Sequence, residues 1–141
     1  METTQRSHEE IEQLSGKEKR ILIVEPDARQ AERMYLLFRK ERLAVNSVRR
    51  VSEAIRNIQQ EHVSVLILDV GVTDMAWDDA VPIIKGLDQS LPIIITAANN
   101  SQELEAHVLR QKIFYYHVKS FGTEELILAI RNAIENPRIG K

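Results

Sequence analysis

Short apolar runs alternate with amphipathic stretches along most of the chain, starting at residue 20. Five runs of five or six residues are largely apolar, as expected for strands that a parallel sheet buries on both faces. They are RILIV (20–24), LAVNSV (43–48), VSVLIL (63–68), PIIIT (92–96) and IFYYHV (113–118). The second run is the most polar, which predicts a position nearer an edge of the sheet.

Between these runs, apolar side chains recur at helical spacing behind residues that favour helix N-termini. The predicted helix starts are Asp27 (through about Glu41), Ser52, Asp78 or Asp79, Ser101 (through about Lys112) and Thr123 (to near Asn136). In the short third helix, Pro82 is tolerable only in the first turn, because proline lacks an N–H group.

Strict alternation of five strands and five helices implies an α/β fold, with a parallel sheet and helices on both faces. At 141 residues the chain is long enough for one domain with a real core. We expect this domain at residues 20–136, between a polar, flexible N-terminal arm (1–19) and a short C-terminal tail (137–141).

Composition excludes several classes of protein. The 19 basic and 21 acidic side chains give a net charge of −2, so no excess of positive charge points to nucleic acid or anionic membrane. The absence of cysteine excludes disulfides and thiol chemistry. No apolar run approaches the roughly 20 residues that a membrane span needs, and the N-terminus lacks a signal-peptide core. The sequence therefore predicts a cytoplasmic protein.

Ligands of such folds bind beyond the carboxyl ends of the strands, so the residues at those ends are the informative ones. These positions hold Glu25-Pro26-Asp27, Asp69, Thr96-Ala97 and Lys119-Ser120. Carboxylates, a hydroxyl and an ammonium on one rim suit phosphoryl chemistry: a carboxylate nucleophile, a magnesium ion and donors for phosphoryl oxygens. A lone aspartate after a strand is commonly a cap or turn residue, so the combination carries the prediction.

At these positions the chain resembles the receiver domains of bacterial two-component response regulators, over about residues 20–136. The stretches that carry the resemblance are ILIVEPD, VLILDV, PIIITA and YYHVKSF followed by EEL. The resemblance implies a flavodoxin-like, doubly wound (βα)5 fold. It also implies that Asp69 accepts the phosphoryl group, which Thr96 and Lys119 bind. Ala97 matches the small residue after the switch hydroxyl, and Tyr116 the aromatic whose rotation reports the state of the site.

The resemblance further implies a magnesium ion, held by Glu25, Asp69 and the backbone carbonyl of Gly71. Pro26 stands where the family usually has a second acidic residue, so one anionic ligand is lost and we expect weakened magnesium binding. Asp27 is a secondary candidate ligand, because the N-cap that we predict for it occupies its side chain.

Two further features depart from the family pattern. Ser120 replaces the proline that follows the lysine, and a cis bond before a non-proline residue costs about 3–4 kcal/mol, so the Lys119–Ser120 bond should be trans. The loop after Asp69 carries Trp77. This indole either covers the acidic pocket, meets a partner or packs on its neighbours.

The resemblance implies a signalling module, not an enzyme, that takes a phosphoryl group from a histidine kinase or phosphotransfer protein. Output would pass to a protein partner through the last two helices and the fifth strand, and a homodimer is left open. One alternative is a pseudo-receiver, a protein-binding module that works without phosphorylation. A second is a magnesium-dependent phosphohydrolase. It is disfavoured because those enzymes commonly place the nucleophilic aspartate after the first strand, where Glu25 stands.

Overall fold

The computed structural model describes residues 19–135, so the predicted tail and all but the last residue of the predicted arm lie outside the described part. The strands are β1 (Arg20–Val24), β2 (Ala44–Val48), β3 (Val65–Asp69), β4 (Ile93–Ala97) and β5 (Tyr115–Val118). The helices are α2 (Ala28–Lys40), α3 (Val51–Gln60), α4 (Trp77–Leu87), α5 (Gln102–Leu109) and α6 (Glu124–Glu135), and a 3-10 turn, η1 (Lys119–Phe121), follows β5.

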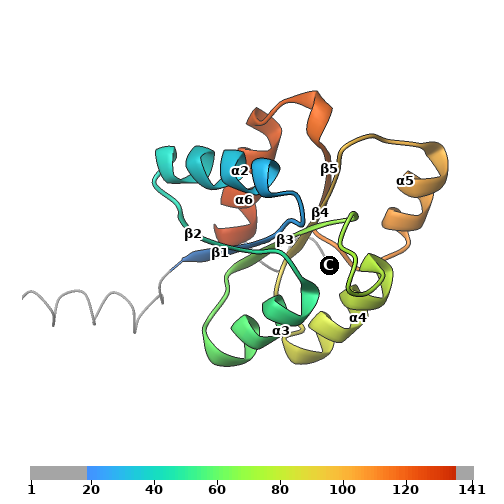
Figure 1. Ribbon diagram of the computed structural model, residues 1–141, viewed down its shortest axis with the longest axis horizontal. Helices are drawn as coiled ribbons and strands as arrows, with labels where there is room; N and C mark the ends of the chain where they lie inside the picture. The colour runs from blue at the N-terminus through green and yellow to red at the C-terminus, as the bar shows by residue number, and fades with distance from the viewer. Residues whose placement is uncertain (1–18, 136–141) are drawn as a thin grey trace, which may run out of the picture.

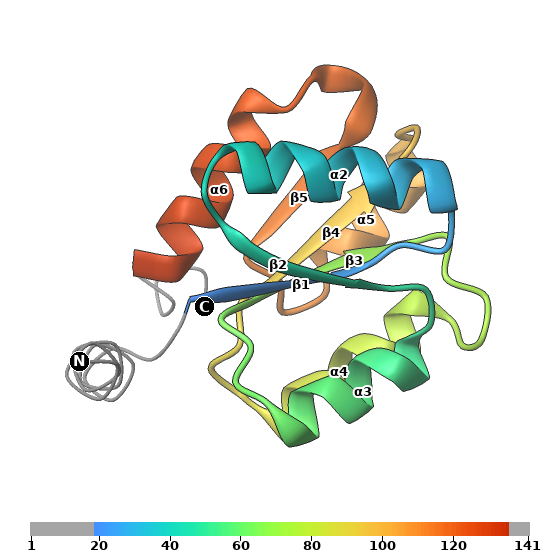
Figure 2. The same ribbon diagram turned by 60° about the vertical axis from the view of Figure 1, so that its left-hand side comes forward.

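The five strands form one parallel sheet in the order β2-β1-β3-β4-β5 (Figure 1). Helices α2 and α6 cover one face, and α3, α4 and α5 cover the other (Figures 1 and 2). This confirms the predicted doubly wound sheet of five strands with five helices, and it confirms that the second strand lies at an edge. Strand order reverses between β1 and β3, so their carboxyl ends flank the crevice in which such folds bind ligands.

The sheet divides the core into two apolar layers. On one face, the side chains of β1, β3 and β4 pack against α3, α4 and α5, with Ala54 and Ile84 fully buried. On the other face, alternate residues of the same strands pack against α2 and α6, with Phe38 and Ile130 fully buried. The two layers hold the central strands rigidly, so their carboxyl ends form a fixed platform.

We expect Ile130→Val to lower the free energy of unfolding by about 1 kcal/mol, because it removes one methylene group from a packed interior. Ile130 is 0% exposed, whereas Leu128 on the same helix is 62% exposed. Leu128→Ala is the control, and its effect should stay within about 0.5 kcal/mol. Urea unfolding of both variants gives the comparison, and equal losses would contradict the assigned orientation of α6.

Two predicted helix starts and the predicted position of Pro82 were wrong. Helix α3 begins at Val51 with Arg50 at its N-cap, so Ser52 is not the cap. Helix α4 begins at Trp77 with Ala76 at its N-cap, ahead of Asp78. As a result Pro82 lies inside α4, beyond the first turn. It is tolerated there because it lies on the exposed side of the helix, where water can solvate the carbonyl group that lacks its usual donor.

Two other caps are confirmed. The Asp27 carboxylate accepts hydrogen bonds from the N–H groups of Arg29 (2.9 Å) and Gln30 (3.0 Å) at the start of α2. The Ser101 hydroxyl accepts one from Leu104 N–H (3.0 Å) at the start of α5. Helix α5 ends at Leu109, earlier than predicted, where the N–H groups of residues 110 and 111 bond three residues back and tighten the last turn.

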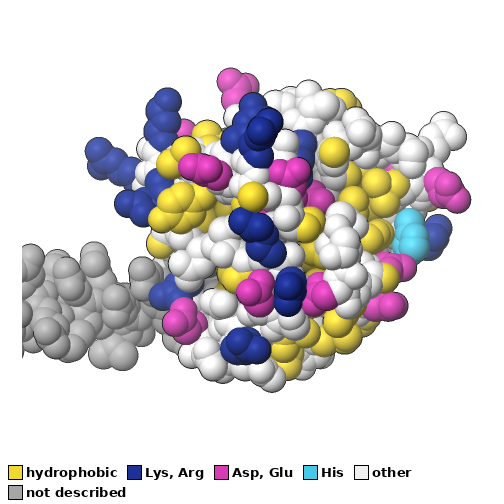
Figure 3. Space-filling view, viewed as in Figure 1, with side chains coloured by type: hydrophobic (Ala, Val, Ile, Leu, Met, Phe, Trp, Pro, Cys, Tyr) yellow, Lys and Arg dark blue, Asp and Glu magenta, His cyan; other side chains and the backbone are white. Residues whose placement is uncertain are grey.

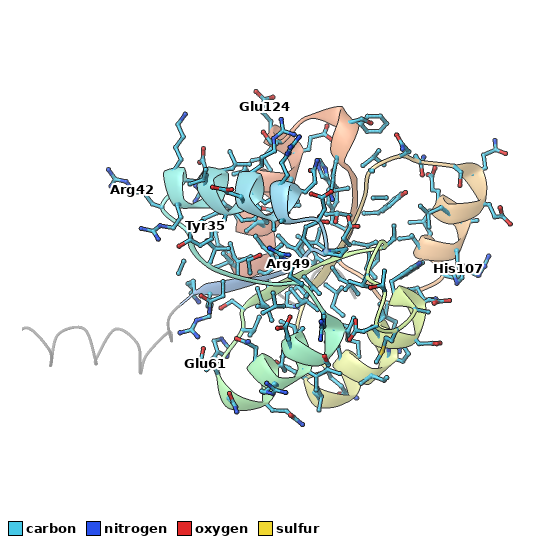
Figure 4. The ribbon with its side chains drawn as sticks, in the orientation of Figure 1. Tyr35, Arg42, Arg49, Glu61, His107 and Glu124 are labelled. Carbon is cyan, nitrogen blue, oxygen red and sulfur yellow. The ribbon has the colours of Figure 1, made fainter. Side chains whose placement is uncertain are left out.

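Trp77 is part of the core and not of a loop. Its side chain is 9% exposed and packs in the layer beneath α3 and α4. The ring of His107, labelled on α5 in Figure 4, lies 5.2 Å from the indole, and its Nε2 atom is 3.0 Å from Asp78 Oδ2. Of the alternatives for this indole, packing on its neighbours is therefore confirmed, and the contact joins α5 to the start of α4.

Basic and acidic side chains are intermixed over the face shown in Figure 3, with a group of basic side chains near the end of α2. Arg39, Lys40 and Arg42 are exposed there, and the guanidinium of Arg39 lies over the ring of Tyr35. Among residues 19–135, no helix has the length and apolar character required to cross a membrane.

Candidate functional site

Asp69 is the last residue of β3, and its carboxylate is almost fully engaged. Oδ1 accepts a hydrogen bond from the Thr96 hydroxyl (2.8 Å) and lies 2.8 Å from Lys119 Nζ. Oδ2 accepts one from the N–H group of Gly71 (2.9 Å). Thr96 is the register partner of Asp69 on β4, which explains why the hydroxyl reaches the carboxylate. Asp69 remains 7% exposed, so one side of it faces the surface.

Lys119 joins two carboxylates at this edge of the sheet. Its Nζ atom forms ion pairs with Glu25, the residue after β1, and with Asp69, the end of β3. Glu25 is 2% exposed, and its Oε2 atom accepts a hydrogen bond from Asp27 N–H (3.2 Å). Glu25, Asp69, Thr96 and Lys119, which the strand pattern predicted to meet on one rim, do meet. Every buried polar side-chain atom in the described residues has a hydrogen-bond partner.

Burial and charge shift the titration of these groups. Burial, together with the neighbouring charge of Asp69, raises the pKa of Glu25, while Lys119 works in the opposite direction. Burial also disfavours the ammonium of Lys119, but its contacts with Asp69 and Glu25 outweigh this and raise the pKa of the lysine. The contacts with Glu25 and Asp69 thus favour the charged form of Lys119.

The residues after β1 are divided between the site and the helix. The Asp27 carboxylate caps α2, which is the first of the two roles expected for it; the other was metal binding. Pro26 faces the site: a Cβ atom placed on Gly71 would lie 3.7 Å from Pro26 Cγ and 2.9 Å from Asp69 Oδ2. Gly71 lies so close to the carboxylate of Asp69 that a residue with a side chain at position 71 would force one of the two to move. This approach explains a glycine two residues after Asp69.

The remaining predicted residues lie around this cluster. Ala97 ends β4 and is 1% exposed. Tyr116 is half-buried on β5, and its hydroxyl donates to Asn100 Oδ1 (2.8 Å) in the loop that follows β4. No peptide bond in the described chain is cis, so the Lys119–Ser120 bond is trans, as predicted. Lys119 reaches both carboxylates with this geometry, and η1 begins directly at the lysine.

The donor set can be compared with what magnesium requires. Within residues 19–135, no three histidine, cysteine, aspartate or glutamate side chains form a metal cluster. The site offers two carboxylates, Glu25 and Asp69, with the backbone of Gly71 against the second. Magnesium often binds through only one or two carboxylates and keeps several waters, so this smaller set fits the ion.

Two features escaped sequence reasoning. Asp74 accepts hydrogen bonds from the first N–H groups of α3, more than 20 residues earlier in the chain. A surface hollow of about 860 Å³ lies at the amino ends of β4 and β5, lined by residues such as Pro82, Pro92 and Phe114. It is at the opposite edge of the sheet from Asp69, so it is not the site described above.

The fold and the Asp69–Lys119 cluster define the class: a doubly wound α/β domain with an acidic site at its switch point. The family model described as "Response regulator receiver domain" matches residues 21–131. The chain belongs to this family of receiver domains, as the resemblance of its strand-end motifs indicated.

Relatives agree with this assignment. The two-component response regulator PhoP of Pseudomonas aeruginosa is 25% identical over 107 residues, which cover 76% of this chain. The chain spans about half (48%) of the length of that curated relative. A CheY-like receiver domain protein from Methanospirillum hungatei matches with a TM-score of 0.76 and 20% identity, covering 84% of this chain and 95% of its own. TrrA of Thermotoga maritima, solved in complex with Mg(2+)-BeF, has a TM-score of 0.73 and 20% identity over 81% and 97% of the two chains.

Proposed function

We propose that this receiver domain accepts a phosphoryl group on Asp69 and signals through protein contacts. The observation that carries the proposal is the convergence of Glu25, Asp69, Thr96 and Lys119, contributed by different elements, at the carboxyl edge of the sheet. We place the receiver unit at residues 20–136. The donor would be a phosphohistidine on a histidine kinase or phosphotransfer protein, and the domain would act in the cytoplasm.

The chemistry needs positive charge, because a carboxylate attacks a phosphoryl group that is itself negative. An oxygen of Asp69 forms a bond to phosphorus, the bond from phosphorus to the histidine nitrogen breaks, and the imidazole leaves with its electron pair. Lys119 and the Thr96 hydroxyl, both already on Oδ1 of Asp69, would bind the transferred oxygens. Magnesium, held by Glu25, Asp69 and the Gly71 carbonyl, would supply further charge when bound.

Output would follow from the movement of two side chains. When Thr96 turns to the phosphoryl group, it makes room for Tyr116 to turn inward and leave Asn100 in the β4–α5 loop. The surface of α5, β5 and α6 would change as a result. Three of the exposed large apolar side chains lie in this region: Leu109 (64%), Phe121 (73%) and Leu128 (62%). They suit contact with a protein partner or with a second copy of the domain.

Mass spectrometry after incubation with acetyl phosphate tests the proposal. We expect wild-type protein to gain one phosphoryl group in the presence of magnesium and much less without it, because Lys119 alone neutralises little of the charge. Asp69→Asn should gain none, since an amide is not a nucleophile of this kind. Asp79→Asn, which changes an exposed aspartate in the first turn of α4, is the matched control and should be phosphorylated normally.

The alternative is a binding module that works without phosphorylation, and the absence of an acidic residue at Pro26 is the feature that favours it. No gain of mass in wild-type protein under any condition would refute phosphorylation and leave this alternative. A gain that persists in Asp69→Asn would also refute the assignment of Asp69.

A further inference from the structure

The loop between β3 and α4 (residues 70–76) is held at both ends. At its start, Gly71 N–H donates to Asp69 Oδ2 (2.9 Å) and Val70 N–H donates to the carbonyl of Thr96 (2.9 Å). Further along, Asp74 Oδ1 accepts from Val51 N–H (2.9 Å) and Asp74 Oδ2 accepts from Ser52 N–H (3.0 Å). One carboxylate thus attaches the loop to the beginning of α3.

The attachment point is rigid. Val51 and Ala54 in the first turn of α3 are fully buried against the sheet. Arg50, at the N-cap, makes no side-chain hydrogen bond to the helix. The carboxylate of Asp74 instead satisfies two of the first N–H groups of α3, which have no partner within the helix. Its negative charge also suits the positive end of the helix. Asp74 therefore binds the loop to an element that does not move easily.

The position of the loop matters to Asp69, because the backbone comes very close to it. The Cβ position of Gly71 is 2.9 Å from Asp69 Oδ2, closer than ordinary van der Waals contact. Between the two attachments, Val72 is 7% exposed and packs in the core layer beneath α3 and α4. A shift of a few tenths of an ångström at Gly71 would change both its hydrogen bond to Asp69 and the direction of its carbonyl group.

We propose that Asp74 is a positioning residue: by tying the loop to α3, it holds the backbone of Gly71 in place against Asp69. The inference rests on the proposed function only where it predicts phosphorylation rates; the position of Gly71 can be tested without phosphorylation. The carboxylate stays ionised at neutral pH. Partial desolvation raises its pKa, but the N–H groups of Val51 and Ser52 outweigh that effect, and the net pKa is lowered.

The same helix start provides a matched control. Glu53 Oε1 accepts hydrogen bonds from the N–H groups of Arg49 and Arg50, both at 3.1 Å. Arg49 is labelled in Figure 4, just before α3. Glu53→Ala removes two carboxylate bonds from the beginning of α3, as Asp74→Ala does, but leaves the loop of residues 70–76 untouched. Comparing the two variants separates positioning of the loop from general support of the helix.

Two measurements are needed on wild-type protein and on the variants Asp74→Ala, Asp74→Asn and Glu53→Ala. The first is hydrogen exchange of the Gly71 amide, followed by NMR. The second is the initial rate of phosphorylation by acetyl phosphate at saturating magnesium. For Asp74→Ala we expect exchange at Gly71 to quicken and phosphorylation to slow by about tenfold, because a displaced backbone misplaces the reacting carboxylate. Asn, which keeps one accepting oxygen, should give an intermediate result.

Glu53→Ala should change neither quantity by more than about twofold, even if it lowers the midpoint of thermal unfolding by as much as Asp74→Ala does. Equal effects of the two variants on Gly71 exchange would overturn the inference, and so would unchanged exchange in Asp74→Ala. If wild-type protein takes no phosphoryl group, the proposed function fails. Selective quickening of Gly71 exchange in Asp74→Ala would then still support the positioning role.

Discussion

Replacement of Lys119 by methionine is expected to lower the free energy of unfolding by about 3–5 kcal/mol near neutral pH. The ammonium lies between Glu25 and Asp69, whose side chains are 3% and 10% exposed. Removing it leaves two carboxylates buried side by side without a counter-charge. Desolvation and mutual repulsion then act on both, since Thr96 O–H and the backbone N–H groups of Gly71 and Asp27 supply only hydrogen bonds.

The loss of unfolding free energy in Lys119→Met should be larger at alkaline pH than at acid pH. The pKa of Glu25 is already raised in the folded protein, so its contribution favours folding at acid pH and is lost as pH rises through the folded pKa. Without Lys119 that pKa rises further. We therefore expect the deficit of Lys119→Met relative to wild type to be largest at pH 8 and to shrink at pH 5.5, where Glu25 takes up a proton more readily.

Urea unfolding at both pH values measures this. The control is Arg131→Met, which breaks an exposed ion pair with Glu41 (3.1 Å) and should cost no more than about 1 kcal/mol at either pH. The double variant Glu25→Gln with Lys119→Met should recover part of the loss, because only one buried carboxylate remains. A deficit for Lys119→Met that grows on acidification would contradict the placement of Lys119 as the counter-charge of Glu25 and Asp69.

Replacement of Pro26 by aspartate should destabilise the folded protein without magnesium and strengthen its binding of magnesium. Pro26 Cγ lies 3.7 Å from the Cβ position of Gly71, beside Asp69, so a carboxylate at position 26 enters the same site. Without metal, three carboxylates would share one lysine, and we expect a loss of about 1–3 kcal/mol in stability. With magnesium, the added anionic ligand should tighten binding by at least about tenfold.

Thermal unfolding in EDTA and over a magnesium series tests this, because a ligand that binds only the folded state raises the midpoint by an amount that grows with the logarithm of its concentration divided by Kd. Pro26→Ala is the control: it removes the ring without adding charge and should bind magnesium as wild type does. If Pro26→Asp and Pro26→Ala show the same magnesium dependence, position 26 does not face the metal, and the weak site has another cause.

The elements of the fold were predictable because their causes are local. A run such as ILIV at 21–24 is apolar on both faces, and only a strand inside a parallel sheet buries both. Asp27 and Ser101 cap the helices that follow them directly, so residue type and position were sufficient. Element boundaries differed by one or two residues at most strands, because the last pairing of a strand depends on its neighbour and not on its own residues.

The starts of α3 and α4 were not predictable in the same way. Val51 and Ser52 receive their acceptor from Asp74, which lies 22 to 23 residues away in sequence, so no local motif marks it. Ser52 is a good cap by type, but the helix begins at Val51, two residues before the start that a cap at Ser52 would give, because Val51 is buried against the sheet. At Trp77 the same cause operates: the indole is packed in the core, and the helix begins where that packing orients the backbone.

The sequence by itself determined the alternation of strands and helices and the set of residues at the carboxyl ends of the strands. Parallel strands bring those ends to one edge, so Glu25, Asp69, Thr96 and Lys119 had to be neighbours. Only the tertiary structure decided how they pair. Lys119 lies 94 residues from Glu25 in sequence, and its bridge to both carboxylates depends on strand order, on the trans bond to Ser120 and on η1. The pKa values of Glu25 and Lys119 depend on the distances between the charged groups and on their burial. Those distances and that burial arise only when the chain folds.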